Sequence, residues 1–189
     1  MIHYYTNREI SEKLEINLAR WKRWSRSFLA PDPLGGMQSG YARQYVFKDL
    51  FKVFLGGHLL SHLKLSVAES RQVLSDLSPW LKKQGFFDLP GGNGTGTAQK
   101  MPPAGYRIYF SPLPAAKTKT ATGVGYLIRR TLSRQVHGAA VDRQIMEIVE
   151  ETPLHCDLHE GRAFMELPQV HLINLSALFL WLIERLDET

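Results

Sequence analysis

Cysteine is nearly absent from this sequence: Cys156 is the only one among 189 residues. A single cysteine excludes an intrachain disulfide framework and fits a reducing compartment. Long apolar runs are also missing, since the longest, Ala177–Ile183, is far shorter than the ~20 residues that span a membrane. The first residues show no basic stretch followed by an apolar one, so we expect no signal peptide and a cytoplasmic protein.

The overall composition is that of a globular protein, but its charge is unevenly distributed. Hydrophobic residues make up 44% and charged residues 22%, which is too apolar for a disordered chain. Residues 1–85 hold 13 Lys+Arg against 7 Asp+Glu, a net charge of +6, whereas residues 86–189 hold 10 against 11, a net charge of −1. The basic excess of the first half favours a module that binds a polyanion.

One stretch, residues 88–105, divides the chain. It contains five glycines and three prolines, a density of helix and strand breakers that excludes a helix or a central strand. We interpret it as a linker between an N-terminal domain, residues 1–87, and a C-terminal domain, residues 106–189. A long ordered loop is the alternative.

The first half begins with two helix starts in close succession. Thr6-Asn7-Arg8-Glu9 is a capping box, which predicts a short helix ending near Leu14. After a tight turn, Asn17 is a good N-cap for a second helix.

The second predicted helix has two contrasting faces. Apolar residues at helical spacing form a stripe for burial: Leu18, Trp21, Trp24 and Phe28. The other side carries four cations: Arg20, Lys22, Arg23 and Arg26. Two short helices in this arrangement predict a helix-turn-helix whose second helix enters the major groove of DNA, where the cations meet base edges and phosphates. A merely solvated helix face is the alternative.

The segment after this helix is typical of a wing. A turn-rich loop over residues 31–40 leads into Tyr41-Ala42-Arg43-Gln44-Tyr45. We expect Tyr41, Arg43 and Tyr45 to clamp the DNA backbone from this wing.

Two further helices complete the first half. One begins near Lys48 and contains Gly56-Gly57, each of which costs roughly 1 kcal/mol relative to Ala in a helix. Such a cost predicts a neighbouring backbone packed closely there, or a kink. Ser66 and Glu69 form a second capping box, which opens a helix ending near Gly85.

The order of these features resembles the DNA-binding domain of MerR-type transcription regulators over roughly residues 4–82. The residues that match the family pattern are Ile16-Asn17 in the turn, Lys22 and Trp24 in the recognition helix, Leu29 and Pro31 at its exit, Gly40-Tyr41, Arg43 and Tyr45 in the wing, Asp49-Leu50 at the next helix, and Leu65-Ser66 with Glu69 at the last. The resemblance implies a winged helix-turn-helix that reads duplex DNA. The family's long coiled-coil dimerisation helix has no counterpart here, and the related winged helices of phage excisionases also lack it.

The second half predicts a small α+β domain of antiparallel strands and a C-terminal helix. Strands are expected over residues 106–110 and 124–136, and a short edge over residues 163–167 and 170–173. Residues 141–151 fit either a helix or a strand, and we favour the strand because of the β-branched content and the preceding His137-Gly138 turn.

The C-terminal helix, capped by Asn174, is apolar nearly all round. A helix of this kind needs two burial partners, of which one is its own sheet. We expect the other to be a second subunit, so that the helix forms a homodimer contact. The residues expected in this contact are Leu175, Leu178, Phe179, Trp181, Leu182 and Leu186.

Patterns that suggest chemistry are weak. Residues 155–160 place His155, Cys156 and His159 within metal-binding reach, but a polar loop is the favoured interpretation. His58 and His62 lack the adjacent Glu of a metalloprotease helix, and the Gly-rich residues 91–96 lack the Lys-Ser/Thr of a phosphate loop. We therefore predict no catalytic residue, no metal and no cofactor.

Together these features predict a sequence-specific transcription regulator that binds double-stranded DNA as a homodimer, with an effector left open. An architectural or excisionase-like recombination factor with the same contacts is one alternative. A protein–protein adaptor whose basic face is only solvated is another.

Overall fold

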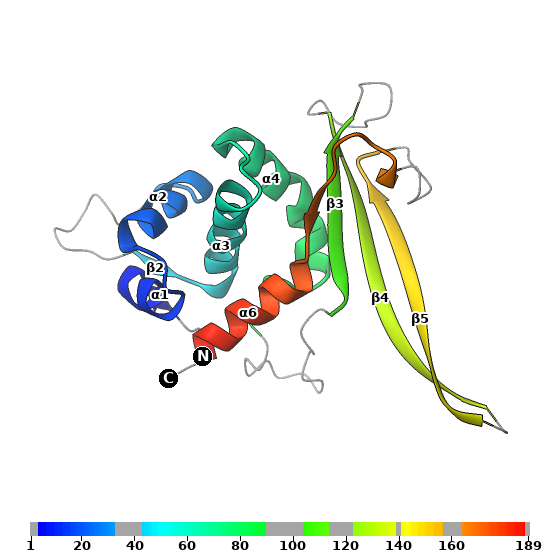
Figure 1. Ribbon diagram of the computed structural model, residues 1–189. Helices are drawn as coiled ribbons and strands as arrows, with labels where there is room; N and C mark the ends of the chain where they lie inside the picture. Colours follow the sequence, from blue (N-terminus) through cyan, green and yellow to red (C-terminus); the bar gives the residue numbers. More distant parts are fainter. Residues whose placement is uncertain are drawn as a thin grey trace. The chain divides into compact units, whose positions relative to one another are not determined.

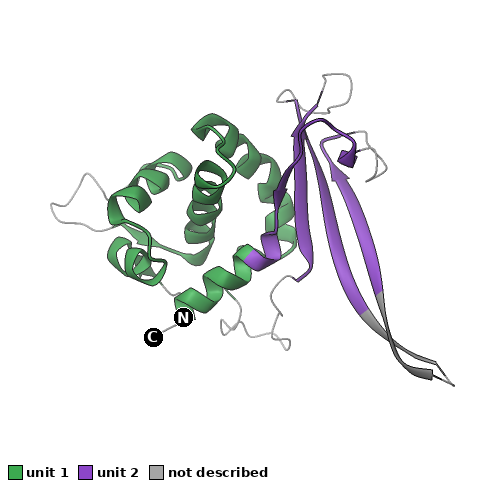
Figure 2. Cartoon of the chain, in the orientation of Figure 1, with its two compact units in different colours: residues 1–103, 178–189 green, residues 104–177 purple. Residues whose placement is uncertain are grey.

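The chain has an α+β fold, in a computed structural model that describes residues 4–32, 43–89, 104–113, 123–138, 141–156 and 164–187, with the backbone alone for residues 134–138 and 141–146. It divides into two compact units, residues 1–103 with 178–189 and residues 104–177 (Figure 2). We call them the helical unit and the sheet unit. In chain order the elements are β1 (Tyr5–Thr6), α1 (Asn7–Lys13), α2 (Leu18–Phe28), β2 (Gln44–Tyr45), α3 (Phe47–Ser61), α4 (Val67–Lys83), β3 (Tyr106–Pro112), β4 (Val124–Gly138), β5 (Val141–Leu154), β6 (His171–Ile173) and α6 (Leu175–Asp187) (Figure 1).

The helix starts predicted from capping residues are confirmed. At α1 the Glu9 N–H donates to Thr6 Oγ1 at 3.3 Å, and the Thr6 N–H donates to the Glu9 carboxylate at 3.2 Å. Ser66 and Glu69 repeat this reciprocal pair at α4. The side chain of Asn17 accepts from two backbone N–H groups at the start of α2. These local bonds satisfy N–H groups that have no partner inside the helix.

Two glycines of α3, Gly56 and Gly57, form a notch in which the aromatic side chains of α2 lie. A Cβ atom on Gly56 would lie 2.6 Å from the ring of Phe28, and one on Gly57 would be closer still to the ring of Trp24. We expected a close backbone or a kink here, but aromatic side chains make the approach instead. Because rings occupy the space of two missing side chains, the buried face of α2 is fixed against α3.

The N-terminal elements of the helical unit are joined by a short antiparallel pair. Strand β1 pairs with β2, with Tyr5 opposite Tyr45 and Thr6 opposite Gln44. The wing was expected mostly before β2, and residues 33–42, Tyr41 among them, lie outside the described residues. The linker assigned to residues 88–105 likewise falls mainly on residues 90–103, which are not described.

Helix α6 supplies part of the core of the helical unit. The Phe179 ring meets three other phenylalanine rings edge-on, with centroid distances of 5.7 Å to Phe47, 5.4 Å to Phe51 and 5.2 Å to Phe86. The indole of Trp181 stacks on Phe54 at 5.4 Å. From residue 178 onwards, α6 therefore groups with the helical unit rather than with residues 104–177.

This packing differs from the expected homodimer contact and from the expected domain 106–189. The side chains of Leu175, Phe179, Leu182 and Leu186 are at most 5% exposed within one chain, and Leu178 is half-buried. Of the expected contact residues, Trp181 alone is exposed, by 38%. The helical unit of the same chain therefore buries Phe179, Leu182 and Leu186.

The sheet unit is one antiparallel sheet in the order β5-β4-β3-β6. The strands predicted near residues 106–110 and 124–136 are present as β3 and β4, and the ambiguous residues 141–151 are a strand, β5, which continues to Leu154. Strand β3 begins at Tyr106, opposite Arg130. The Thr131 N–H still donates to the Gly105 carbonyl at 3.0 Å, and beyond it the described residues of β4 up to Gly138 pair with β5.

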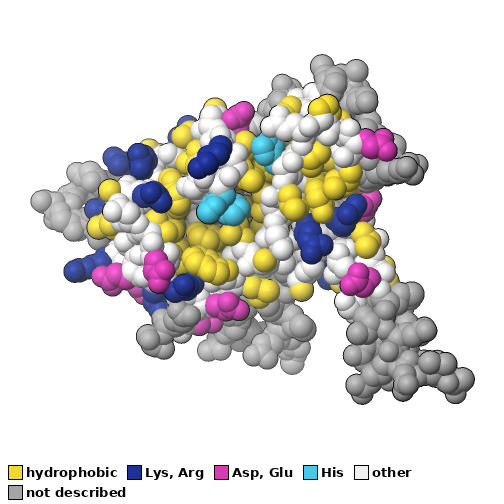
Figure 3. Space-filling model, viewed as in Figure 1, with side chains coloured by type: hydrophobic (Ala, Val, Ile, Leu, Met, Phe, Trp, Pro, Cys, Tyr) yellow, Lys and Arg dark blue, Asp and Glu magenta, His cyan; other side chains and the backbone are white. Residues whose placement is uncertain are grey.

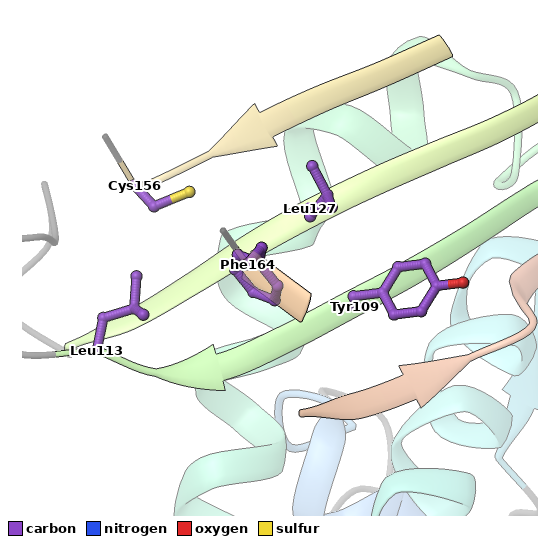
Figure 4. Packing of buried hydrophobic residues seen from close by; sticks show 5 residues of the cluster. All are labelled: Tyr109, Leu113, Leu127, Cys156 and Phe164. Atoms are coloured by element: carbon purple, nitrogen blue, oxygen red, sulfur yellow. The ribbon is translucent and has the colours of Figure 1, made fainter. Parts of the chain in front are cut away.

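Both faces of the sheet are buried at the centre of β4. Tyr126, Leu127 and Ile128 are each at most 2% exposed. Leu127 lies in an apolar cluster on the face opposite Tyr126. The other members of that cluster are Tyr109, Leu113, Cys156 and Phe164 (Figure 4).

We expect Gly57→Ala to lower the free energy of unfolding by about 1–3 kcal/mol, because the new methyl group would overpack against Trp24. An unhindered Gly→Ala change in a helix would instead stabilise by about 1 kcal/mol. Urea denaturation measures the difference. In a Trp24→Leu background, where the ring is gone, Gly57→Ala should cost less, and a stabilising Gly57→Ala in the wild-type background would contradict the packing described.

Phe179→Ala should lower the free energy of unfolding by about 3–5 kcal/mol, since it empties the centre of an aromatic core. The neighbouring Leu180→Ala, at a side chain that is 37% exposed, is the matched control and should cost much less. Light scattering separates this account from a dimer contact: Phe179→Ala should leave the molar mass of the folded protein unchanged, whereas loss of a dimer would halve it.

Candidate nucleic-acid interface

The four cations predicted on α2 all lie on its exposed side. Arg20, Lys22, Arg23 and Arg26 are exposed, whereas Trp21 and Trp24 of the same helix are buried. Within the described part of the chain, none of the four cations forms a salt bridge. This contrasts with Arg129 of the sheet unit, which pairs with Glu151 at 2.6 Å. The helix therefore presents, opposite its buried stripe, positive charge that no described residue pairs.

A groove of about 1050 Å³ runs along this side of the helical unit. Four of its lining residues are cationic and one, Asp32, is acidic. The cations are Arg8 of α1, Lys22 and Arg26 of α2, and Arg43 beside β2. Apolar side chains such as Leu18 and Leu29 complete the walls. Lys and Arg side chains are visible over α1 and α2 in Figure 3, with acidic side chains beside them.

The groove brings together some of the predicted DNA contacts and separates others. Lys22, Arg26 and Arg43 share its lining, whereas Arg20 and Arg23 are exposed on α2 outside it. Arg43 is half-buried, and its guanidinium carbon lies 5.7 Å from the ring centroid of Tyr45, within cation–π range. This contact orients the Arg43 side chain at the wall of the groove.

Tyr45 corrects one part of the prediction, because its side chain is buried, although the residue lines the groove. Its side chain is 1% exposed, and its ring packs edge-on against Trp21 at 5.6 Å. The phenol oxygen lies 2.7 Å from Asn7 Oδ1 and 2.8 Å from Ser25 Oγ. Since a phenol has one proton, it donates to the Asn7 amide oxygen and accepts from the Ser25 hydroxyl. Tyr45 thus fixes β2 to α1 and α2. Arg43 lies immediately before β2 and is held in place with it.

Arg8 is a member of the groove that sequence reasoning missed. It lies within the first capping box, Thr6-Asn7-Arg8-Glu9, in which the pattern gives a role to Thr6 and Glu9 alone. Its guanidinium pairs with Glu12 one helical turn later at 3.2 Å, and both side chains are largely exposed. An exposed pair of this kind is weak, so Arg8 can exchange Glu12 for another anion at small cost.

The described histidines and the cysteine of the predicted metal-binding patterns do not gather into a site. The rings of His58 and His62 stack at 4.6 Å, and burial, followed by the proximity of His62, lowers the pKa of His58. Cys156 is buried, with its thiol 3.5 Å from the carbonyl oxygen of Tyr126, while residues 157–160 lie outside the description. In the described ranges no three His, Cys, Asp or Glu side chains could hold one ion.

Two further findings bear on the interface. In the part of the chain that is described, no helix has the length and apolar character needed to cross a membrane. Comparison with protein-family models and with curated proteins gave no match.

Tyr45→Phe should lower the free energy of unfolding by about 1–2 kcal/mol, because Asn7 and Ser25 lose the hydroxyl that links them. Tyr4→Phe, at a tyrosine that is 51% exposed, is the control and should leave stability unchanged. Urea denaturation measures both. If Tyr45→Phe instead left stability intact and weakened binding to duplex DNA, the phenol would face the nucleic acid and the burial described would be wrong.

Proposed function

We propose that this chain is a sequence-specific DNA-binding protein whose helical unit acts as a MerR-like winged helix-turn-helix, with α2 as the recognition helix. One observation carries the proposal. Four exposed cations on α2 have no acidic partner among the described residues, and they lie opposite a tryptophan stripe that is packed against α3.

The geometry of α2 suits this role. A single α-helix fits the major groove, and arginine can read guanine there with two hydrogen bonds. We assign this reading to Arg23, on the outer side of α2. Lys22, Arg26 and Arg43, which share the groove beside it, would hold phosphates and set the position of the helix on the duplex.

The further step to transcription regulation rests on the MerR resemblance. The proposed activity is binding without catalysis, and the sheet unit would receive a signal. The α6 dimer contact is not part of this proposal, because Leu175, Phe179, Leu182 and Leu186, four of its six expected residues, are at most 5% exposed within one chain. An architectural or recombination factor would use the same contacts. The genomic positions of the bound sites distinguish it from a transcription regulator: binding at promoters supports a regulator, and binding at attachment sites supports a recombination factor.

An unbiased selection of duplex DNA by the full chain tests the proposal. We expect an enriched sequence motif. We also expect binding that weakens steeply with salt, with a slope of log K against log salt of roughly −3 to −4.5 if about three to five phosphates are neutralised. No enrichment and a flat salt titration would favour a protein–protein adaptor instead.

Two substitutions should differ in kind. Arg23→Ala should cost on the order of 1–3 kcal/mol in affinity for the selected site and relax the preference at one base pair. Arg43→Ala should weaken binding to all sequences about equally and reduce the salt slope by about one. Lys83→Ala removes the same charge from an exposed position of α4 and is the control, with little effect on either quantity. Affinity and selected sequence are measured for all three variants. The assignment of base reading to Arg23 and of phosphate binding to Arg43 is wrong if Arg43→Ala alters the motif while Arg23→Ala does not.

A further inference from the structure

A second, smaller pocket of about 260 Å³ lies in the helical unit between α2, α3 and α4. Helix α4 contributes four side chains at i, i+3, i+4 and i+7 spacing, which places them on one face of the helix. The lining residues are Phe28 of α2, Lys52 of α3, and Arg71, Leu74, Ser75 and Ser78 of α4. The pocket therefore combines two cations, two hydroxyls and two apolar side chains, and none of the described residues that line it is a carboxylate.

Several hydrogen-bond donors of this pocket have no partner among the described residues. The ammonium of Lys52 forms no salt bridge with any described residue, although it lies 5.5 Å from the ring centroid of Phe87. The guanidinium of Arg71 uses only Nε, which donates to the Ser27 carbonyl at 2.5 Å. Its two terminal nitrogens and the hydroxyls of Ser75 and Ser78 have no hydrogen-bond partner among the residues described.

The charge of Lys52 is not compensated inside the pocket. Burial, followed by the nearby charge of Lys48, lowers the pKa of Lys52, while Asp49 acts in the opposite direction. A cation in such a place gains from an anion that enters, because the anion replaces the hydration that burial removes.

We propose that this pocket binds a small ligand through a phosphoryl group. Lys52 and Arg71 supply the positive charge, and the hydroxyls of Ser75 and Ser78 donate further hydrogen bonds. A phosphoryl group matches this set better than a carboxylate, because it brings three acceptor oxygens and close to two negative charges. The pocket is smaller than the roughly 300–1000 Å³ of sites for drug-sized ligands, so inorganic phosphate or a short phosphate monoester is the size that fits.

The position of the pocket links it to the end of α2. Arg71 already holds the carbonyl of Ser27, and Phe28, which lines the pocket, lies in the glycine notch of α3. A ligand on Arg71 would therefore restrain the C-terminal turn of the helix that carries the exposed cations. The proposal goes beyond DNA binding and does not rest on it.

Inorganic phosphate is the probe for the test. The full chain, labelled with ¹⁵N, is titrated with phosphate in a chloride buffer of constant ionic strength, and amide shifts are followed by NMR. We expect saturable shifts at Phe28, Ser75 and Ser78. Lys52→Gln should weaken binding by about tenfold, the effect of losing one charge-assisted hydrogen bond. Lys48→Gln is the matched control: it removes the same charge from the same helix, also beside Phe87, but outside the pocket lining, and should change binding less than twofold.

Further outcomes decide against the proposal. Shifts that do not saturate, or equal weakening by the two lysine variants, would show only general attraction to a basic surface. Ser78→Val leaves the charge unchanged and removes one of the two hydroxyl donors, so it too must weaken binding while the NMR spectrum stays folded. If duplex DNA displaced phosphate and Lys52→Gln weakened DNA binding to the same degree, the occupant would be a DNA phosphate and the free ligand would be excluded. A chain that bound no DNA at all would leave the phosphate result standing.

Discussion

The contact between the aromatic side chains of α2 and the two glycines of α3 sets the orientation on which the interface depends. Trp24 and Phe28 occupy the space of the side chains that Gly56 and Gly57 lack. Once this stripe is fixed, the helical repeat directs Arg20, Lys22, Arg23 and Arg26 to solvent. The glycines lower the intrinsic stability of α3 and gain a close helix pair in return.

A second constraint joins the two ends of the chain. The helical unit is completed by residues 178–189, so the sheet unit, residues 104–177, is inserted between α4 and the later turns of α6. Phe179 packs among phenylalanines of α3 and of the turn after α4, and Lys13 of α1 donates to the carbonyl of Leu186 at 2.9 Å. The fold of the helical unit therefore requires a helix that follows the sheet unit in sequence.

Features governed by neighbouring residues could be read from the sequence. Thr6 with Glu9, Ser66 with Glu69, and Asn17 act over three residues or fewer, so the caps and starts of the helices followed directly. The strands β3, β4 and β5 followed from local propensity. The exposed side of α2 followed from helical periodicity.

Features that depend on distant partners could not be read in this way. The apolar faces of α6 predict two burial partners without naming them, and the phenylalanines against which Phe179 packs lie in an earlier part of the same chain. Tyr45 is a tyrosine in the segment expected to form a wing, and such a residue would be expected to contact DNA. Its hydroxyl instead binds Asn7 and Ser25, which lie far away in sequence. The phosphate pocket needs residues from three helices, and no linear motif contains them.

The most direct test of the central claim is to map where duplex DNA touches the full chain. Hydrogen exchange or amide NMR with and without a short mixed-sequence duplex, at low and high salt, gives this map. The account predicts changes concentrated in α2 and around Arg43, with little change in β4 and β5, and their loss at high salt. Changes confined to the sheet unit, or none at any salt concentration, would contradict it.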